Sequence, residues 1–435
     1  MTVQKYISGG TAVNIAGSVE SALAGGHLGP GTLLPAVRAL ADHLRVSPAT
    51  VASAYRMLQD RGVVVADGRR GTRVRPMAPI SLPREAPLPA GVRDLSDGNP
   101  DPALLPDLDL ALRRLEMGSR LYGEELNDAE LLELAREQFA ADGIPNANVS
   151  IVSGAMDGIE RVLREHLRAG DRVAVEDPGF TGILDLLNAL SLVAVPVPLD
   201  DEGILPNELK KAIRSCDALI VTPRAQNPSG AAFTARRARE LRRVLAARPE
   251  LLLLEDDHAG VVAGAGYLSI IDKSREKWAV VRSVSKSFGP DLRVALLAAD
   301  HLTHARVEGR QNLGVRWVSH ILQRLVVLLA RDRAPQKAGR IYTERRNALL
   351  AALRNRNIPA FGASGLNVWI PVPEETATVQ ALMHEGWAVK AGERYRIATP
   401  SAIRVTISTL EPKDALRFAD ALANVIAPRS RTSGA

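Results

Sequence analysis

Cysteine is almost absent from this sequence, because Cys216 is the only one among 435 residues. No disulfide can form within the chain, and such a composition is typical of proteins that stay in a reducing compartment. The first ten residues, MTVQKYISGG, also lack the apolar run of a secretory signal peptide. From these two absences we expect a cytoplasmic protein.

Long hydrophobic runs are missing as well. The most apolar late stretch, residues 317–330 (WVSHILQRLVVLLA), is interrupted by His320, Gln323 and Arg324. A bilayer requires about 20 predominantly apolar residues, so this stretch is too short and too polar to span one. We interpret it as a buried helix and predict neither a membrane partner nor a metal site.

Outside the N-terminal region, the chain has almost no excess of either charge. Residues 1–75 hold nine Lys or Arg and four Asp or Glu, whereas the remaining residues hold 46 and 45. Nearly all of the net charge of +6 therefore lies near the N-terminus. A small basic module on a near-neutral body suits contact with the phosphate backbone of nucleic acid. The length is enough for about three domains.

The N-terminal region has the local signals of three short helices. Residues 14–24 and 36–44 are predicted helices, and a three-residue turn separates the second from a third at 48–61. Ser47 is a good N-cap, and Pro48 suits the first helical position. Two helices joined by such a turn form a helix-turn-helix, in which the helix at 48–61 would enter the major groove of DNA.

A basic hairpin follows these helices. Residues 63–75 (VVVADGRRGTRVR) predict two short strands with Asp67-Gly68 near the turn and with four arginines. Residues 28–64 and 68–74 together resemble the winged-helix domain of GntR-family regulators. On the local signals alone, an unrelated three-helix bundle with a basic hairpin would also fit. The resemblance implies DNA contacts from Arg38, Ser47, Thr50, Arg69, Arg70 and Arg73.

The recognition helix departs from some relatives of this family. Pro48 and Ala52 stand where those relatives carry arginines. Because base contacts come from the first turns of this helix, the operator sequence does not follow from the resemblance.

Composition changes after the hairpin. Residues 76–93 hold five prolines in their first fourteen positions, which favours an extended spacer over a packed element. We therefore predict a winged helix-turn-helix domain at 1–75, a Pro-rich linker at 76–93 and a body at 94–435. A smaller C-terminal subdomain is expected from about residue 331.

The body alternates short apolar runs with helical segments, the pattern of an α/β protein with a parallel sheet. The carboxyl ends of such strands are where functional residues gather. The predicted strands of the large sheet are 172–178, 218–223, 251–257 and 278–284. Residues 365–372 and 402–408 are predicted strands of the smaller α+β subdomain.

Lys286 stands at one of these strand ends, in SVSKSFGPDLRVA (residues 283–295), with Arg293 seven residues on. By itself it is better explained as a solvated surface lysine, as most lysines are. A lysine amine can also form a Schiff base with an aldehyde, the chemistry of pyridoxal phosphate. Asp256, after the apolar run LLLL, would then hold the protonated ring nitrogen of that cofactor.

Other strand ends supply the remaining groups of a pyridoxal phosphate site. A helix that begins after a small-residue turn can bind the phosphate through its free N–H groups, and an arginine adds bidentate contacts. An aromatic ring can stack on the pyridine, and polar side chains can bond its phenolate oxygen. The candidates for these roles are Ser153, Gly154, Ala155, Ser283 and Arg293 for the phosphate, Phe180 for stacking, and Asn227 and His258 for the phenolate oxygen.

Each of these residues alone has an ordinary structural explanation, but their order along the chain is specific. From SGA through EDPGF, NPSG, EDDH and SxSK to IRV, residues 94–435 resemble a fold-type I aminotransferase. Such a body behind a winged helix is the architecture of the MocR-type subfamily of GntR regulators. The motifs LSDGNPDP, TPRAQNPSG and RSVSKSFGPDLRVA resemble its PtsJ-type branch.

That resemblance implies pyridoxal phosphate as cofactor and a head-to-tail, domain-swapped homodimer in which each body serves the other protomer's site. It also implies a role in vitamin B6 salvage, with a pyridoxal kinase gene as target. Arg404 in AIRVTIS would bind the α-carboxylate of an effector amino acid, and Tyr122 would contact the partner's phosphate. A pairing of Arg404 with a neighbouring acid is the alternative.

Two departures from ordinary aminotransferases bear on function. His258 stands where a tyrosine usually contacts the phenolate oxygen, and its charge could change near neutral pH. The sequence after Tyr122 also lacks the usual continuation. We therefore predict a DNA-binding regulator that senses pyridoxal phosphate or its amino-acid adducts. The alternatives are a working aminotransferase with an accessory DNA-binding domain and a DNA-binding protein whose body is only a scaffold.

Overall fold

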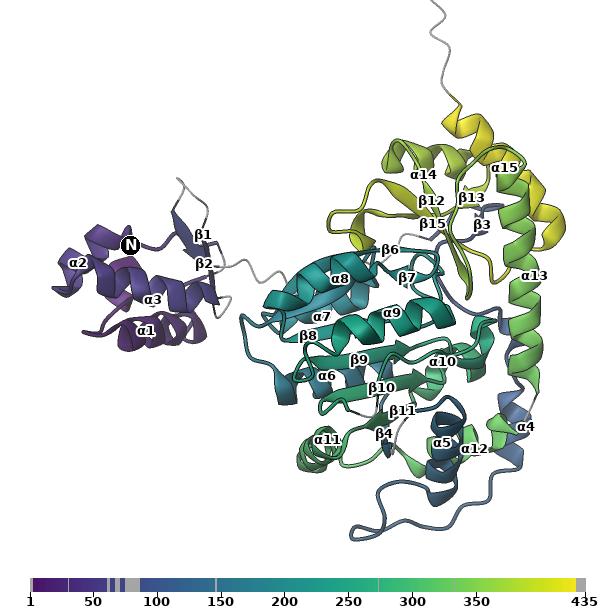
Figure 1. The fold of residues 1–435 in the computed structure, drawn as a ribbon, viewed down its shortest axis with the longest axis horizontal. Helices are drawn as coiled ribbons and strands as arrows, with labels where there is room; N and C mark the ends of the chain where they lie inside the picture. Colours follow the sequence, from purple (N-terminus) through teal and green to yellow (C-terminus); the bar gives the residue numbers. More distant parts are fainter. Residues whose placement is uncertain are drawn as a thin grey trace, which may run out of the picture. The chain divides into compact units, whose positions relative to one another are not determined.

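The computed structural model describes residues 3–29, 31–60, 63–66, 71–74, 87–144, 147–272, 274–331 and 333–427. The chain divides into two compact units, one that contains residues 1–85 together with 167–173 and 184–194, and one that contains the remaining residues (Figure 1). In the described ranges, no helix combines the length and the apolar character that crossing a bilayer requires.

The N-terminal unit is a winged helix-turn-helix, as predicted. Val51, Leu58 and Leu40 are fully buried between its helices. The turn before the third helix is fixed by Ser47, whose Oγ accepts a hydrogen bond from Thr50 N at 3.1 Å. The elements are η1 (Val3–Tyr6), α1 (Ala12–Ala24), α2 (Val37–Leu44), α3 (Pro48–Asp60), β1 (Val64–Ala66) and β2 (Thr72–Val74).

The wing is an antiparallel pair of strands, in which Val64 lies opposite Val74. Leu33 adds an isolated bridge to Arg73 and so ties the wing to the segment before α2. The predicted wing residues Arg69 and Arg70 lie outside the described residues, as does most of the predicted linker.

An eight-stranded sheet forms the centre of the body, in the order β4-β11-β10-β9-β8-β5-β6-β7. Strands β8, β9 and β10 are parallel, whereas β11 runs antiparallel to β10 and β4. The expectation of a parallel sheet was therefore wrong at this edge. Parallel neighbours need a crossover of a dozen or more residues, and residues 284–294 are too few.

The bounds of β5, β8, β9 and β10 match the four predicted apolar runs to within two residues, whereas the other four strands were not predicted. The eight strands are β4 (Asn148–Val152), β5 (Arg172–Asp177), β6 (Val193–Asp200), β7 (Gly203–Ile204), β8 (Ala218–Val221), β9 (Leu252–Asp257), β10 (Trp278–Ser283) and β11 (Ala295–Ala299).

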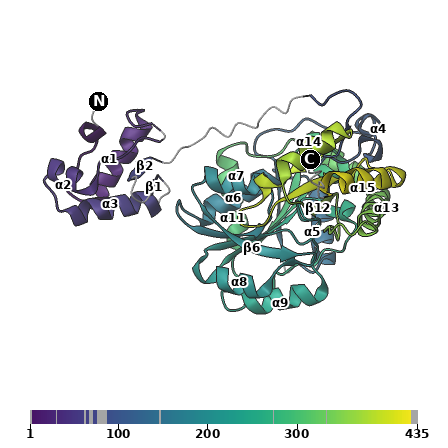
Figure 2. The same cartoon turned by 90° about the horizontal axis from the view of Figure 1, so that it is seen from above.

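Helices cover both faces of this sheet. Figure 2 shows α6, α7 and α11 on one face and α8 and α9 on the other. Residues 317–330 include a buried helix, as predicted, which contacts the helix at 129–141. The helices are α4 (Leu108–Arg113), α5 (Ala129–Ala141), α6 (Ala155–His166), α7 (Thr181–Ala189), α8 (Pro206–Ala212), α9 (Ala235–Leu245), α11 (His301–Leu313) and α12 (His320–Ala330).

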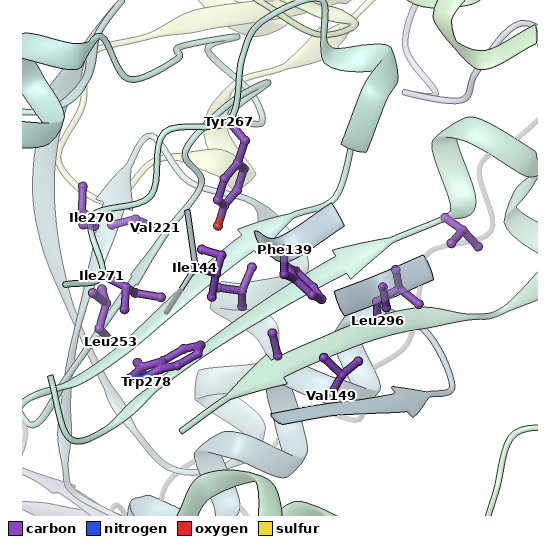
Figure 3. Packing of buried hydrophobic residues seen from close by; sticks show 14 of the residues in the cluster. Phe139, Ile144, Val149, Val221, Leu253, Tyr267, Ile270, Ile271, Trp278 and Leu296 are labelled. Carbon is purple, nitrogen blue, oxygen red and sulfur yellow. The ribbon is translucent and has the colours of Figure 1, made fainter. Parts of the chain in front are cut away.

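The main hydrophobic core lies against this sheet. Phe139 from α5, Leu253 from β9 and Trp278 from β10 contribute to it, and Tyr267 lies at its rim (Figure 3). Fully burying such a side chain stabilises the fold by about 1.5–3 kcal/mol. The sheet is therefore a rigid support for the loops at its edge.

A smaller α+β subdomain follows, as expected. Its three-stranded sheet has the order β12-β15-β14, and β3 pairs with β13 in a separate parallel ribbon beside it (Figure 1). The elements are β3 (Arg93–Asp94), β12 (Asn367–Pro371), β13 (Trp387–Ala388), β14 (Lys390–Ala391), β15 (Ala402–Thr406), α13 (Ala334–Arg354), α14 (Glu375–His384) and α15 (Pro412–Ile426).

Candidate functional site

The predicted site segments meet at one edge of the large sheet. Asp256 in β9 lies opposite Val281 in β10, so the loops after both strands leave the sheet side by side. The end of β4, Val152, lies opposite Ala295 at the start of β11. Residues 153–155 therefore adjoin the connection that carries Lys286 and Arg293.

Lys286 lies in a single helical turn, α10 (Ser285–Phe288), directly after β10. Its Nζ donates a hydrogen bond to Gly98 O at 2.7 Å. Burial lowers the pKa of Lys286 to about 8, and the charge of Arg404 adds to this, while Asp97 opposes it. A larger share of neutral amine is therefore present at neutral pH than for an ordinary lysine, as a nucleophile requires.

Arg404, in the middle of β15, reaches the same place. Its Nη1 donates to Asn227 Oδ1 at 3.3 Å and its Nη2 to Ser96 O. The guanidinium lies over the Tyr395 ring, 5.0 Å from the centroid. In the described part of the chain, Arg404 forms no ion pair with an acid. Its contacts therefore do not support the alternative, in which Arg404 pairs with a neighbouring acid. A buried guanidinium of this kind can receive a carboxylate.

Asp256 is a buried carboxyl whose Oδ1 has no hydrogen-bond partner among the described residues, and the residue is only 5% exposed. Burial, together with the charges of Asp257 and Glu176, raises the pKa of Asp256 to about 8. A buried carboxylate is stable only when a cation or donor is paired with it. A protonated ring nitrogen has that chemistry.

The turn between β4 and α6 forms an anion cradle. Gly154 has φ +96° and lies so close to Arg293 that an added Cβ would stand 2.8 Å from Nη2 of the guanidinium. Arg293 itself is exposed, with a left-handed backbone. The twelve-residue helix α6 then begins at Ala155. Its N-terminal N–H groups and the guanidinium together suit a phosphate dianion.

Two further predicted residues lie after strands of the large sheet or at a strand end. Phe180 precedes α7, and its ring packs on Gly182, where an added Cβ would stand 2.6 Å from the ring. Ser283 is buried at the end of β10, and its Oγ accepts a bond from Ser285 N at 3.2 Å.

His258 differs from the prediction in its charge. Burial lowers its pKa to about 4, and the charge of Lys286 lowers it further. The expected change of charge near neutral pH is therefore wrong, and the imidazole is neutral there. A neutral imidazole still donates one hydrogen bond, which is what a phenolate oxygen needs.

Tyr122 is not brought to these residues within one chain. It is 79% exposed, packs edge-on against Trp317 with 5.6 Å between ring centroids, and lies under the guanidinium of Arg316. Its contact with a partner's phosphate remains a prediction.

A pair of arginines fixes the end of β9 and was not predicted from the sequence. Arg224 donates two hydrogen bonds to Asp257, each of 2.8 Å, and Arg282 Nε donates a third at 2.6 Å. Burial alone would raise the pKa of Asp257, but the two arginines hold it well below its usual range. Two arginines inside apolar strand patterns, in VTPRA and VVRSV, were the available signal.

Two other supporting groups were missed. Glu176 accepts bonds from Thr222 N (3.0 Å) and Gln226 Nε2 (3.1 Å), and burial raises its pKa to about 7. Asp177 accepts three backbone N–H bonds from residues 397–399, and so joins the large sheet to the smaller subdomain. A run of adjacent acids in EDP was the only hint of either role.

In the N-terminal unit, the predicted DNA contacts Arg38, Ser47, Thr50 and Arg73 lie on exposed or half-buried positions. Arg38 on α2 is exposed, and Thr50 on α3 shares a 2.8 Å hydrogen bond with Ser47. Arg73 Nη1 donates to Gly31 O at 3.3 Å, so this residue also supports the wing. Their contacts with DNA remain predictions.

Comparison with known proteins gives a consistent picture. Residues 94–422 match the family model of aminotransferase class I and II, and residues 11–74 match that of bacterial regulatory proteins of the gntR family. The chain is 38% identical over 419 residues to the vitamin B6 salvage pathway transcriptional repressor PtsJ of Salmonella typhimurium, covering 94% of this chain and 96% of that protein.

More distant similarities agree with this. The HTH-type pyridoxine biosynthesis transcriptional regulator PdxR of Corynebacterium glutamicum is 29% identical over 251 residues, covering 55% of this chain and 54% of that one. Among solved structures, LysN, the α-aminoadipate aminotransferase of Thermus thermophilus complexed with N-(5'-phosphopyridoxyl)-L-leucine, matches with a TM-score of 0.68 and 21% identity. That match covers 78% of this chain and 92% of LysN.

Proposed function

The chain belongs to the GntR-family transcription regulators that carry a class I and II aminotransferase domain, and we propose that its body binds pyridoxal phosphate and reports the occupied state to the winged helix. The observation that carries the proposal is Asp256, a buried carboxyl whose Oδ1 has no bond to any described residue. A scaffold gains nothing from such a group, because it costs stability unless a ligand pairs with it.

The residues present fit this cofactor. Asp256 would hold the ring nitrogen, Lys286 would form the covalent bond to the aldehyde, and His258 would donate to the phenolate oxygen. The N-terminus of α6 and Arg293 would hold the phosphate, with Gly154 leaving the room that a side chain would fill. When bound, pyridoxal phosphate supplies an aldehyde for reversible attachment of amines and a ring that accepts electrons.

The chain's own groups then define what else the site accepts. Arg404 lies beside Lys286 and lowers its pKa, so a carboxylate on Arg404 would lie close to the lysine nitrogen. Such a placement selects an α-amino acid, whose amine and carboxylate are adjacent. We infer that the effector is pyridoxal phosphate or its adduct with an amino acid.

A homodimer completes the proposal. Leu121, Tyr122, Leu313 and Val315 are all at least 60% exposed, and Tyr122 contacts Trp317, so these apolar side chains come from two adjacent segments. Exposed apolar groups of this size are typical of an interface. A second copy in head-to-tail arrangement would cover them and bring its own Tyr122 to the phosphate.

The names of two relatives support a proposal for the regulated genes. PtsJ is described as a repressor of vitamin B6 salvage and PdxR as a regulator of pyridoxine biosynthesis. We propose that this protein controls vitamin B6 salvage genes, such as one for a pyridoxal kinase, and that it acts in the cytoplasm, where such an operator is accessible.

A titration of the purified protein with pyridoxal phosphate tests the cofactor proposal. We expect a visible absorption band that saturates at one cofactor per chain, and borohydride should then fix the cofactor on Lys286 by mass spectrometry. Added amino acids should shift the band without sustained turnover. No saturable band would refute the proposal, and many turnovers of keto acid per chain would favour the working aminotransferase.

A further inference from the structure

The side-chain amide of Gln226 joins two loops that each carry a residue assigned to the cofactor ring. Its Nε2 donates to Glu176 Oε2 at 3.1 Å and to Pro178 O at 2.9 Å. Asn227 follows Gln226 directly, and Phe180 stands two residues after Pro178. One amide group therefore fixes the segment of the predicted phenolate donor against the segment of the predicted stacking ring.

Every polar group of Gln226 is bonded. On its side chain, Oε1 accepts from Ser229 N at 2.9 Å and from the Ser229 hydroxyl. On its main chain, N donates to Ala231 O at 3.1 Å, and O accepts from Gly230 N at 2.6 Å. The residue is fully buried. Because donors meet one end of the side-chain amide and acceptors meet the other, the amide can take only one orientation.

The burial of the two loops shows what they present to a ligand. From Val221 to Phe233, all of which the structure describes, only Asn227 is not buried. In the described stretch 173–180, only Phe180 is not buried. Each loop therefore exposes one residue beside a buried and bonded segment. A fully satisfied buried polar network is rigid, so it holds the exposed residue in place.

Glu176 anchors this arrangement in the large sheet. It is a buried residue of β5, and its Oε1 accepts from Thr222 N at 3.0 Å while its Oε2 accepts from Gln226. Burial is the main cause of the raised pKa of Asp256, and the charge of Glu176 adds to it. Glu176 is therefore linked to the predicted partner of the ring nitrogen as well as to both loops.

We propose that Glu176 and Gln226 are a positioning pair for the cofactor ring, which holds the loop of Asn227 and the loop of Phe180 so that both residues meet the same ring. This inference rests on the proposed function of the same site. Loss of the pair should leave Lys286 able to attach the cofactor but should leave the ring poorly held. A purely structural pair would instead change stability and leave the properties of the bound cofactor unchanged.

Gln226→Met tests the pair in the full-length protein, because methionine has a similar size but no amide. The probe is pyridoxal phosphate. Its dissociation constant should rise roughly tenfold, since the bonds that fix both loops are lost. The visible circular dichroism per bound cofactor should fall, because an achiral ring shows this signal only when the protein holds it in one orientation. Borohydride should still fix the cofactor on Lys286.

Glu255→Gln is the matched control for Glu176→Gln. Glu255 is also a buried carboxyl of the large sheet, in β9. It accepts its bonds from Tyr267, Ser269 and Ile270, none of which is assigned to the cofactor. Both variants should lose unfolding free energy in urea, whereas only Glu176→Gln should weaken cofactor binding and lower the circular dichroism. Equal effects of the two variants on the bound cofactor would contradict a positioning role.

An exchange of the two side chains gives a second test that does not depend on this control. Gln226→Glu alone places two buried carboxyl groups opposite each other and should weaken cofactor binding about 100-fold. Combined with Glu176→Gln, an amide again faces a carboxylate and Ser229 keeps an acceptor, so affinity should recover about tenfold. The bond to Pro178 O is not restored, so the recovery should be incomplete. A double variant that binds no more tightly than Gln226→Glu would overturn the pairing.

Failure of the inference differs from failure of the proposed function. If pyridoxal phosphate does not attach to Lys286 in the unmodified protein, the proposed function is refuted, and the inference with it. If it attaches normally, and Gln226→Met leaves both the affinity and the circular dichroism unchanged, only the positioning pair is refuted.

Discussion

Asp256 and Asp257 are adjacent in β9, yet their side chains meet opposite conditions. Asp257 accepts three hydrogen bonds from Arg224 and Arg282, and its pKa is lowered. Asp256 Oδ1 has no partner in the described part of the chain, and burial raises its pKa to about 8. Successive side chains of a strand face opposite sides of the sheet, so one strand end has a structural side and a ligand side.

The difference between Asp256 and Asp257 separates residues that stabilise the fold from residues that are available to a ligand. On the structural side, Asp257 is paired with Arg224 and Arg282, so removal of one partner should cost stability. On the ligand side, Asp256 Oδ1 accepts no bond from a described residue, and Lys286 and Arg404 donate to uncharged oxygen atoms. Removal of one of them should cost binding and little stability.

The largest expected effect is that of Lys286→Ala on the ligand side. Covalent attachment of pyridoxal phosphate at this site should be lost completely, because Lys286 supplies the amine of the proposed bond, while the melting temperature should not fall. The measurement is borohydride reduction followed by peptide mapping. Lys211→Ala, at an exposed lysine, is the control and should keep full attachment. Persistent labelling of another lysine at full yield would show that Lys286 is wrongly assigned.

The next effect is on the structural side. Asp257→Asn leaves Arg224 and Arg282 buried without their shared counter-charge, and breaking a buried ion pair costs about 3–5 kcal/mol of unfolding free energy. Urea denaturation of the cofactor-free protein measures this loss. Glu208→Gln removes an exposed ion pair with Lys211 and should cost less than about 1 kcal/mol. Similar losses of unfolding free energy in Asp257→Asn and Glu208→Gln would contradict the distinction between the structural side and the ligand side.

Asp256→Asn should separate binding from stability. Loss of a charge-assisted bond should weaken non-covalent cofactor binding about 10- to 150-fold. Without cofactor, folded Asp256 binds its proton more tightly than the unfolded chain does. The contribution of Asp256 to the unfolding free energy is therefore fully present below the unfolded pKa of about 4. It is lost as the pH rises toward the folded pKa of about 8.

The pH dependence of unfolding checks this sign. Between pH 5 and 8, the unfolding free energy of the unmodified cofactor-free protein should fall with pH, in part through Asp256 and Glu176. The fall should be shallower in Asp256→Asn. An identical slope in both proteins, or unchanged cofactor affinity, would place Asp256 outside the ligand side.

The smallest effect concerns the other unit. Arg38→Ala should weaken DNA binding and reduce the log–log salt slope by about 0.9, the value for one lost phosphate contact. The wing double change Arg69→Ala/Arg70→Ala should reduce it by about twice that amount. Cofactor attachment should be unchanged in both variants. An unaltered slope would exclude these residues from the DNA contact.

Most of the site was predictable because its residues follow apolar strands or begin a helix. Asp256 is the last residue but one of β9, Lys286 follows β10, and the turn at 153–154 precedes α6, all as the sequence pattern indicated. These are local signals, and parallel neighbours bring their carboxyl ends together.

The other features of the site could not be predicted from the local sequence pattern. The pairing of Arg224 and Arg282 with Asp257 joins residues from three separate segments. The neutral state of His258 at neutral pH depends on burial, which sequence does not report. Ser96 contacts Arg404, and Gly98 contacts Lys286, although these residues lie far apart in the chain. The segment around Ser96 and Gly98 has no periodic hydrophobic pattern that could have indicated these contacts.

The most direct test of the regulator account is a titration of an operator, selected from a random DNA pool, with cofactor-free and cofactor-loaded protein at one fixed salt concentration. A ligand shifts a conformational equilibrium only through its different affinity for the two states, and typical couplings change affinity about 5- to 150-fold. The account predicts a difference in this range that disappears in Lys286→Ala. Equal DNA affinities with and without cofactor would contradict it.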